Sequence, residues 1–182
     1  MDNNEYIFKS ERLGFRNWTN NDLREFTEIN ADPEVMEHFP STLSEKETED
    51  LIQRLKKHFE EREYTYFATE ILKTGELIGF IGLAYQTYET EFCPATDIGW
   101  RLKKTAWGKG YATEGAEKCI EYAFEELKIS KIFSVCTVNN RNSENVMKKI
   151  GMTKKGEFNH PKLKDYPEYE RCLWYEINKN DG

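Results

Sequence analysis

The fold of this chain is decided by the stretch Trp107-Gly108-Lys109-Gly110-Tyr111-Ala112-Thr113-Glu114. Its two glycines follow a strand-like run at residues 97–102 and precede a segment with helical periodicity. A strand that leads through a glycine-rich turn into a helix can cradle phosphate, because the turn amides are unpaired and the helix N-terminus carries partial positive charge. Glycine also lets a ligand approach the backbone closely. The stretch therefore predicts an anion-binding turn.

Two common phosphate-binding motifs fit this stretch poorly. The dinucleotide-binding fingerprint needs a third glycine or alanine three residues after Gly110, where the chain has Thr113. The P-loop needs Gly-Lys followed by Ser or Thr, whereas Lys109 is followed by Gly110. A plain helix entry and a module that binds ATP or NAD remain as alternatives.

A second motif lies downstream, in the run from Asn139 to Met152 that follows a strand-like segment at residues 131–138. This run and the first stretch resemble the two cofactor motifs of the GCN5-related N-acetyltransferase (GNAT) family. In the first motif, Gly110 and Ala112 take the last two places of the pattern Gln/Arg-x-x-Gly-x-Gly/Ala. Trp107 replaces the Gln or Arg, which is a departure from the family pattern.

The second family pattern runs Asn-x-x-Ser, a short helix, and then Lys-x-Gly-Phe. Asn140 and Ser143 take the first two places, and Lys149 and Gly151 take the later ones. Met152 replaces the Phe, a soft exchange at a packing position. The two motifs occur in the order and at the separation that the family shows.

The beginning of the chain resembles one branch of the family, the ribosomal-protein-alanine N-acetyltransferase-like (RimJ/RimL-type) proteins. Ser10 to Arg16 and Asp32 to Met36 resemble its opening strand and first helices. The resemblance spans nearly the whole chain and implies a single GNAT domain over residues 1–182. It implies an α/β (α+β) fold with a mixed, mostly antiparallel central sheet, a splayed parallel strand pair and flanking helices.

Composition agrees with one globular domain. The 182 residues suffice for a real core, and the net charge of -7 argues against a broad nucleic-acid surface. No segment has the long apolar run of a membrane span, and the acidic N-terminus is not a signal peptide, so we expect a cytoplasmic protein. The four cysteines are scattered without Cys-x-x-Cys, so we expect neither a metal site nor a disulfide framework.

Periodicity and turn signals predict a mixed order of elements. Strands are expected at residues 12–16, 66–72, 77–85, 95–102, 131–138, 153–158 and 169–177. Helices are expected after Asn20-Asn21-Asp22, from the capping box Ser44-Glu45-Lys46-Glu47, and at residues 112–127 and 143–150. The strand–helix–strand order over residues 95–138 predicts a parallel pair with a right-handed crossover.

The resemblance implies acetyl-CoA as cosubstrate, held in a wedge between two splayed parallel strands. Backbone groups of the earlier strand would bond the pantetheine arm and polarise the thioester, the turn amides would meet the pyrophosphate, and Lys109 would neutralise phosphate charge. An ordinary strand end, turn asparagine and solvated lysine are the plain alternatives. The expected cofactor residues are Trp100, Arg101, Leu102, Trp107, Gly108, Lys109, Gly110, Tyr111, Ala112 and Asn140.

The acid and base that acetyl transfer to an amine requires are expected at two positions. Asp97 stands where the branch often carries an acidic residue, and it would accept the amine proton through water. The alternative is a hydrogen-bonded strand aspartate. Ser143 would protonate or hold the leaving thiolate, or would serve as a helix N-cap. Many relatives use a Tyr as acid, and the region around Ser143 has none.

The acceptor is expected to be an amine, either a peptide N-terminus or a small molecule. His160 and Tyr166 belong to a late loop that lies near the acceptor in this fold, so they are candidate substrate contacts. The leading hypothesis is an acetyl-CoA-dependent N-acetyltransferase acting by direct attack in a ternary complex. A catalytically weak acyl-CoA-binding sensor is the alternative from another class. The oligomeric state, monomer or homodimer, is left open, and no nucleic-acid or membrane partner is expected.

Overall fold

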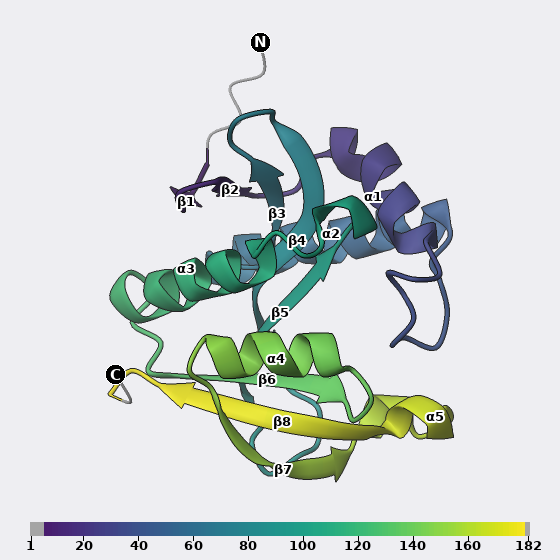
Figure 1. The fold of residues 1–182 in the computed structure, drawn as a ribbon, viewed down its shortest axis with the longest axis vertical. Coiled ribbons are helices and arrows are strands. Elements are labelled where there is room, and N and C mark those ends of the chain that lie inside the picture. The colour runs from purple at the N-terminus through teal and green to yellow at the C-terminus, as the bar shows by residue number, and fades with distance from the viewer. Residues whose placement is uncertain (1–5, 181–182) are drawn as a thin grey trace.

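The computed structural model describes residues 6–180, which build one eight-stranded sheet in the order β1-β2-β3-β4-β5-β6-β8-β7 (Figure 1). All neighbouring strands are antiparallel except β5 and β6. The strands are β1 (Phe8–Lys9), β2 (Leu13–Arg16), β3 (Tyr66–Ile71), β4 (Glu76–Gln86), β5 (Ala95–Leu102), β6 (Lys131–Thr137), β7 (Thr153–Asn159) and β8 (Arg171–Asn178). The predicted mixed, mostly antiparallel sheet is therefore confirmed.

Helices cover both faces of this sheet, and Figure 1 shows α3 and α4 in front of it and α2 behind. The α-helices are α1 (Leu23–Ala31), α2 (Glu45–Arg62), α3 (Tyr111–Glu125), α4 (Arg141–Lys149) and α5 (Pro167–Glu170). Short 3-10 turns are η1 (Asn20–Asp22), η2 (Lys104–Ala106) and η3 (Pro161–Leu163). One apolar cluster joins α3 and α4 to the sheet, and a second joins α1 and α2 to its other face.

Several local predictions are confirmed by the geometry of the helix ends. Ser44 caps α2 by accepting from the Glu47 amide at 3.2 Å, and the Glu47 carboxylate accepts from the Ser44 amide at 2.8 Å. Thr48, Ile52 and Leu55 follow helical spacing in the sequence, and they are buried in α2. The apolar residues at helical spacing in α3, Ala116, Cys119, Ile120 and Ala123, are likewise buried.

Two local expectations are wrong, and one short strand was not predicted. The Asp32 to Met36 segment is not helical but forms turns after α1. The Ser143 side chain is not the cap of α4, because Asn140 caps that helix by accepting from the Ser143 amide at 3.1 Å. The region before Arg12 adds a short strand, β1, whose two residues carry too little pattern to be recognised in the sequence.

The most consequential feature of the sheet is the unequal pairing of β5. It pairs with β4 along its whole length, from Ala95 opposite Gln86 to Leu102 opposite Gly79. With β6 it pairs only where Asp97 lies opposite Phe133. Figure 1 shows β5 running away from β6 beyond that point, so the predicted splayed parallel pair is confirmed.

A buried ion cluster ties β2 to β3 and η1. The Arg16 guanidinium, 5 % exposed, donates to the Asp22 carboxylate at 2.7 and 2.9 Å and also bonds Glu70. The Glu70 carboxylate accepts from the Tyr6 hydroxyl as well, at 2.7 Å. Here a buried cation is matched by carboxylates from two separate elements, which satisfies its charge and its donors.

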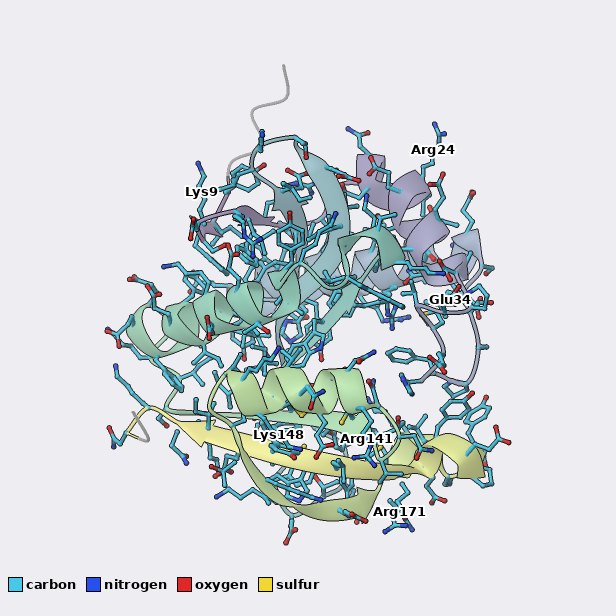
Figure 2. All side chains as sticks on the ribbon, viewed as in Figure 1. Lys9, Arg24, Glu34, Arg141, Lys148 and Arg171 are labelled. Carbon is cyan, nitrogen blue, oxygen red and sulfur yellow. The ribbon has the colours of Figure 1, made fainter. Side chains whose placement is uncertain are left out.

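We predict that Arg16→Met lowers the free energy of unfolding by about 3–5 kcal/mol, because it leaves two buried carboxylates without their cation. Chemical denaturation of the purified protein at neutral pH measures this change. Arg24→Met is the matched control, since Figure 2 shows Arg24 projecting from α1 into solvent, and we expect a change within about 0.5 kcal/mol. Equal stability of the two variants would contradict the prediction.

Candidate active site

The open side of β5 presents backbone groups that no strand pairs. The Lys103 amide donates to the Ile78 carbonyl at 2.8 Å, and hydrogen bonding alternates along an antiparallel ladder. Backbone groups of Ile98, Trp100 and Leu102 therefore point toward β6, while those of Arg101 point toward β4. The Ile98 carbonyl accepts from Ser134 at 2.9 Å, and beyond it the strands have separated. Trp100 and Leu102 thus line the wedge, and the Arg101 backbone does not.

The turn that follows β5 has the conformation that its glycines predict. Gly108 and Gly110 have φ of 71° and 80°, and a Cβ at Gly108 would meet no atom within 4 Å. Within residues 6–180, the amides of residues 108–113 donate no hydrogen bond to the protein. The Trp107 indole donates to the Leu102 carbonyl at 2.8 Å, which holds this turn against the end of β5. The result is a set of outward-facing donors at the N-terminus of α3.

Arg12 borders this turn, although it lies far away in the sequence. Its Nε bonds the Glu114 carboxylate at 2.6 Å, and its guanidinium lies 4.6 Å from the centre of the Tyr111 ring. A Cβ on Gly110 would lie 3.5 Å from the Arg12 guanidinium. The side chain is 43 % exposed and therefore remains open to an anion. Sequence reasoning missed Arg12, because no local spacing connects this position, just before β2, to the turn.

The remaining cofactor candidates lie around the wedge. Lys109 is exposed in the turn, and Ala112 is half-buried in the first turn of α3. Asn140 is half-buried at the start of α4, and its side-chain oxygen is occupied as the cap, which leaves its amide group for a ligand. The Ser143 hydroxyl is half-buried and has no hydrogen-bond partner among the residues that the structure describes.

Asp97 lies at the point where β5 and β6 separate, and its side chain joins a hydrogen-bonded cluster. The carboxylate, 9 % exposed, accepts from the Tyr66 hydroxyl at 2.7 and 2.9 Å and from the Gln86 amide at 3.1 Å. Burial raises the pKa of Asp97 to about 7, although both hydrogen bonds and nearby Lys162 act in the opposite direction. A carboxyl group with this pKa can exchange a proton near neutral pH. Tyr66 and Gln86 were not among the predicted site residues.

The two predicted substrate contacts differ in their surroundings. His160 lies 4.6 Å from the Tyr88 ring and accepts from the Lys162 amide at 3.2 Å. Burial, together with Lys162, lowers the pKa of His160, so the imidazole is neutral at pH 7. Burial and the nearby Asp97 raise the pKa of Tyr88. Tyr166, by contrast, is 47 % exposed.

These features define an α/β fold with a split sheet and a set of unpaired backbone amides at the N-terminus of a helix. The GNAT acetyltransferase domain family matches residues 12–153, and the chain belongs to this family. It is 29% identical over 150 residues to the uncharacterized N-acetyltransferase YnaD of Bacillus subtilis, covering 82% of this chain and 84% of the relative.

Solved structures agree over nearly the full length. A GNAT-family acetyltransferase from Bacillus anthracis superposes with a TM-score of 0.78 at 27% identity, covering 96% of this chain and 98% of that one. RimL, a ribosomal L7/L12 α-N-protein acetyltransferase in complex with coenzyme A, gives a TM-score of 0.77 at 18% identity, covering 98% and 100%. The chain is thus a GNAT acetyltransferase.

The residues that line the wedge fit a bound coenzyme A. Unpaired amides and two positive-φ glycines stand where a pyrophosphate needs donors and space, and unpaired backbone groups of β5 lie next to them. In residues 6–180 no group of His, Cys, Asp and Glu has the arrangement of a metal site. None of the described helices has the length and apolarity to cross a membrane.

We predict that the stability of the protein falls as the pH rises from 5 to 8, because native Asp97 keeps a proton that the unfolded chain has already lost. Asp97→Asn removes this pH-dependent contribution. The difference in unfolding free energy, variant minus wild type, should therefore rise by about 2–3 kcal/mol between pH 5 and pH 8. Denaturation at several pH values measures the difference. Exposed Asp50→Asn serves as control and should follow the wild type, and identical slopes for all three proteins would contradict the prediction.

Proposed function

We propose that this protein moves an acetyl group from acetyl-CoA to a primary amine by direct attack in a ternary complex. The observation that carries the proposal is the split between β5 and β6, with the unpaired amides of residues 108–113 at its end. Acetyl-CoA, when bound, supplies the activated acetyl thioester. The rest of the chemistry falls to the chain's own residues.

Backbone donors would bind and polarise the cosubstrate. The amides of the turn and of the first turn of α3 would hold the pyrophosphate, with Lys109 and Arg12 supplying positive charge. The Trp100 amide, which faces the wedge, would donate to the carbonyl oxygen as negative charge develops there. A single donor of this kind contributes roughly 2.7–4 kcal/mol to such reactions. Asn140 would donate its amide group to the cofactor arm.

Asp97 and Ser143 would handle the protons. Asp97 accepts the proton of the amine through water, the amine nitrogen forms a bond to the carbonyl carbon, and the carbon–sulfur bond breaks. The departing thiolate takes a proton from the Ser143 hydroxyl, which regains one from solvent. Tyr66 and Gln86 position the carboxylate by their hydrogen bonds to it. Its pKa of about 7 suits a base that works near neutral pH.

The acceptor would enter from the face of the sheet that carries α1 and α2, because Asp97 and Tyr66 lie on that face. Figure 1 shows the segment between α1 and α2 on the same side of the molecule as α5, and the exposed Phe39 and Tyr166 belong to these two regions. Two kinds of acceptor amine fit an entry from this face. One is a peptide N-terminus, the type of substrate that the name of RimL states for that protein. The other is a small amine.

We predict that saturating acetyl-CoA, at roughly a hundred times its Kd, raises the melting temperature by about 5–10 °C. Gly110→Glu should abolish this shift, because the new side chain fills the cradle and brings negative charge to the phosphate site. Gly75→Glu is the matched control: Gly75 also has positive φ, at 70°, and lies in the open hairpin between β3 and β4. Both variants place a side chain at positive φ, so equal shifts in the two would refute the placement of the pyrophosphate.

We predict that Asp97→Asn lowers kcat/KM for the amine by about 10²–10⁴-fold, since the proton acceptor is lost. In the wild type, kcat/KM should rise with pH through an apparent pKa near 7, and the variant should lack that limb. Steady-state release of CoA measures both. Asp50→Asn is again the control, and a variant that keeps the wild-type pH profile would exclude Asp97 as the base.

A further inference from the structure

The side chain of Arg101 lies on the acceptor face of β5, four residues after Asp97. Residues that differ by an even number share a face of a strand, so Asp97, Gly99 and Arg101 point the same way. The Arg101 guanidinium lies 4.4 Å from the centre of the Phe39 ring and 5.2 Å from that of Phe80. Its Nη1 donates to the Asn30 side-chain oxygen at 2.8 Å. Two rings and one neutral amide are its surroundings.

No carboxylate compensates this cation in the part of the chain that the structure describes. Arg101 forms no ion pair within residues 6–180, and its Nε is shut off from solvent without a hydrogen-bond partner. Arg16 shows the opposite arrangement, with two carboxylates around one guanidinium. Burial lowers the pKa of Arg101 to about 10, so the side chain still carries its charge at neutral pH. A desolvated charge without a counter-ion is unfavourable, and an anion that arrives with a ligand would relieve it.

The free donors of Arg101 suit a carboxylate in geometry as well as in charge. With Nη1 bonded to Asn30, Nε and Nη2 remain, and they form the edge of the guanidinium that binds a carboxylate through two parallel hydrogen bonds. The residue is only half-buried, and Phe39, the ring over it, is 40 % exposed. Because Nε itself is shut off from solvent, a carboxylate reaches this edge by displacing the exposed Phe39 ring, which belongs to the segment between α1 and α2.

We propose that Arg101 binds a carboxylate of the acceptor, so that the substrates of this enzyme are amines that carry a carboxylate in the same molecule. This inference rests on the proposed function, which places the reacting amine near Asp97. The α-carbons of Asp97 and Arg101 lie about 13 Å apart along the strand. Gly99 lies between them under the Tyr66 ring, which stacks on Phe80 at 4.9 Å. An acceptor with its amine at one end and its carboxylate at the other matches both charged positions.

The test compares glycine, diglycine and triglycine with their C-terminal amides, which keep the amine and lose the carboxylate. For at least one length, we expect wild-type kcat/KM to favour the acid by about ten- to a hundredfold, as for a hydrogen-bonded charge pair. In Arg101→Gln the ratio should fall to within about threefold through a higher KM for the acid, while the KM for acetyl-CoA is unchanged. Arg101→Lys should keep part of the preference, and Arg24→Gln all of it.

A second comparison of substrates identifies which carboxylate of the acceptor Arg101 binds. The peptide amide Gly-Glu-Gly-NH₂ carries its carboxylate on a side chain, and a preference for it over triglycine amide would assign the Arg101 partner to an acidic residue of a peptide. A preference for free triglycine alone would assign it to a terminal carboxylate. Both results support a carboxylate-bearing acceptor, and both should disappear in Arg101→Gln.

Other outcomes overturn the inference without touching the proposed function. Acetylation of the amides at the same rate as the acids would show that Arg101 selects no carboxylate. An unchanged acid-to-amide ratio in Arg101→Gln, with both rates lowered, would make Arg101 a structural residue. If acetyl-CoA binds and no amine in the series is acetylated, calorimetry with CoA present decides: absence of tighter binding of each acid over its amide overturns the inference. Failure to bind acetyl-CoA at all would instead refute the proposed function.

Discussion

One strand, β5, is held firmly on one side and released on the other, and the rest of the site depends on that asymmetry. Its pairing with β4 is complete from Ala95 to Leu102, so its position is fixed. Its pairing with β6 ends almost where it starts, at Asp97 and Phe133. Unpaired backbone groups are expensive to bury, and here they remain available because a ligand can satisfy them. The same strand therefore provides rigidity through one edge and binding through the other.

The sequence predicted this arrangement to the extent that local pattern encodes it. The glycine turn, the capping box at Ser44 and the strand–helix–strand order each have a short-range cause, and each was located correctly. The separation of β5 from β6 was predicted from the resemblance to the GNAT family, because hydrophobic periodicity carries no information about it. What failed was equally local: Asp32 to Met36 has no periodicity strong enough to separate turns from helix, and Asn140 and Ser143 compete for the same cap position.

The partners around the site were beyond the reach of sequence because they come together only in the fold. Tyr66 reaches Asp97 across β4, and Arg12, just before β2, reaches the turn at Gly110. The separation of each pair in the sequence does not distinguish it from any other two distant residues. Strand alternation also reassigned Arg101: its backbone, expected to bind the cofactor, faces β4, while its side chain faces the acceptor side. Only the register of β4 with β5 decides between these two roles.

Two arginines of this sheet, Arg16 and Arg101, illustrate how charge distinguishes a structural residue from a binding residue. Arg16 is surrounded by carboxylates that the fold itself provides, so its ion cluster is complete before any ligand arrives. The side-chain hydrogen-bond partners of Asp97 and Arg101 are neutral, namely Tyr66 and Gln86 for the carboxylate and Asn30 for the guanidinium. They lie too far apart on one strand to pair with each other, so each keeps its binding capacity. A molecule that carries both an amine and a carboxylate would complete both sites at once, which makes the two charges of β5 a single recognition element for the acceptor.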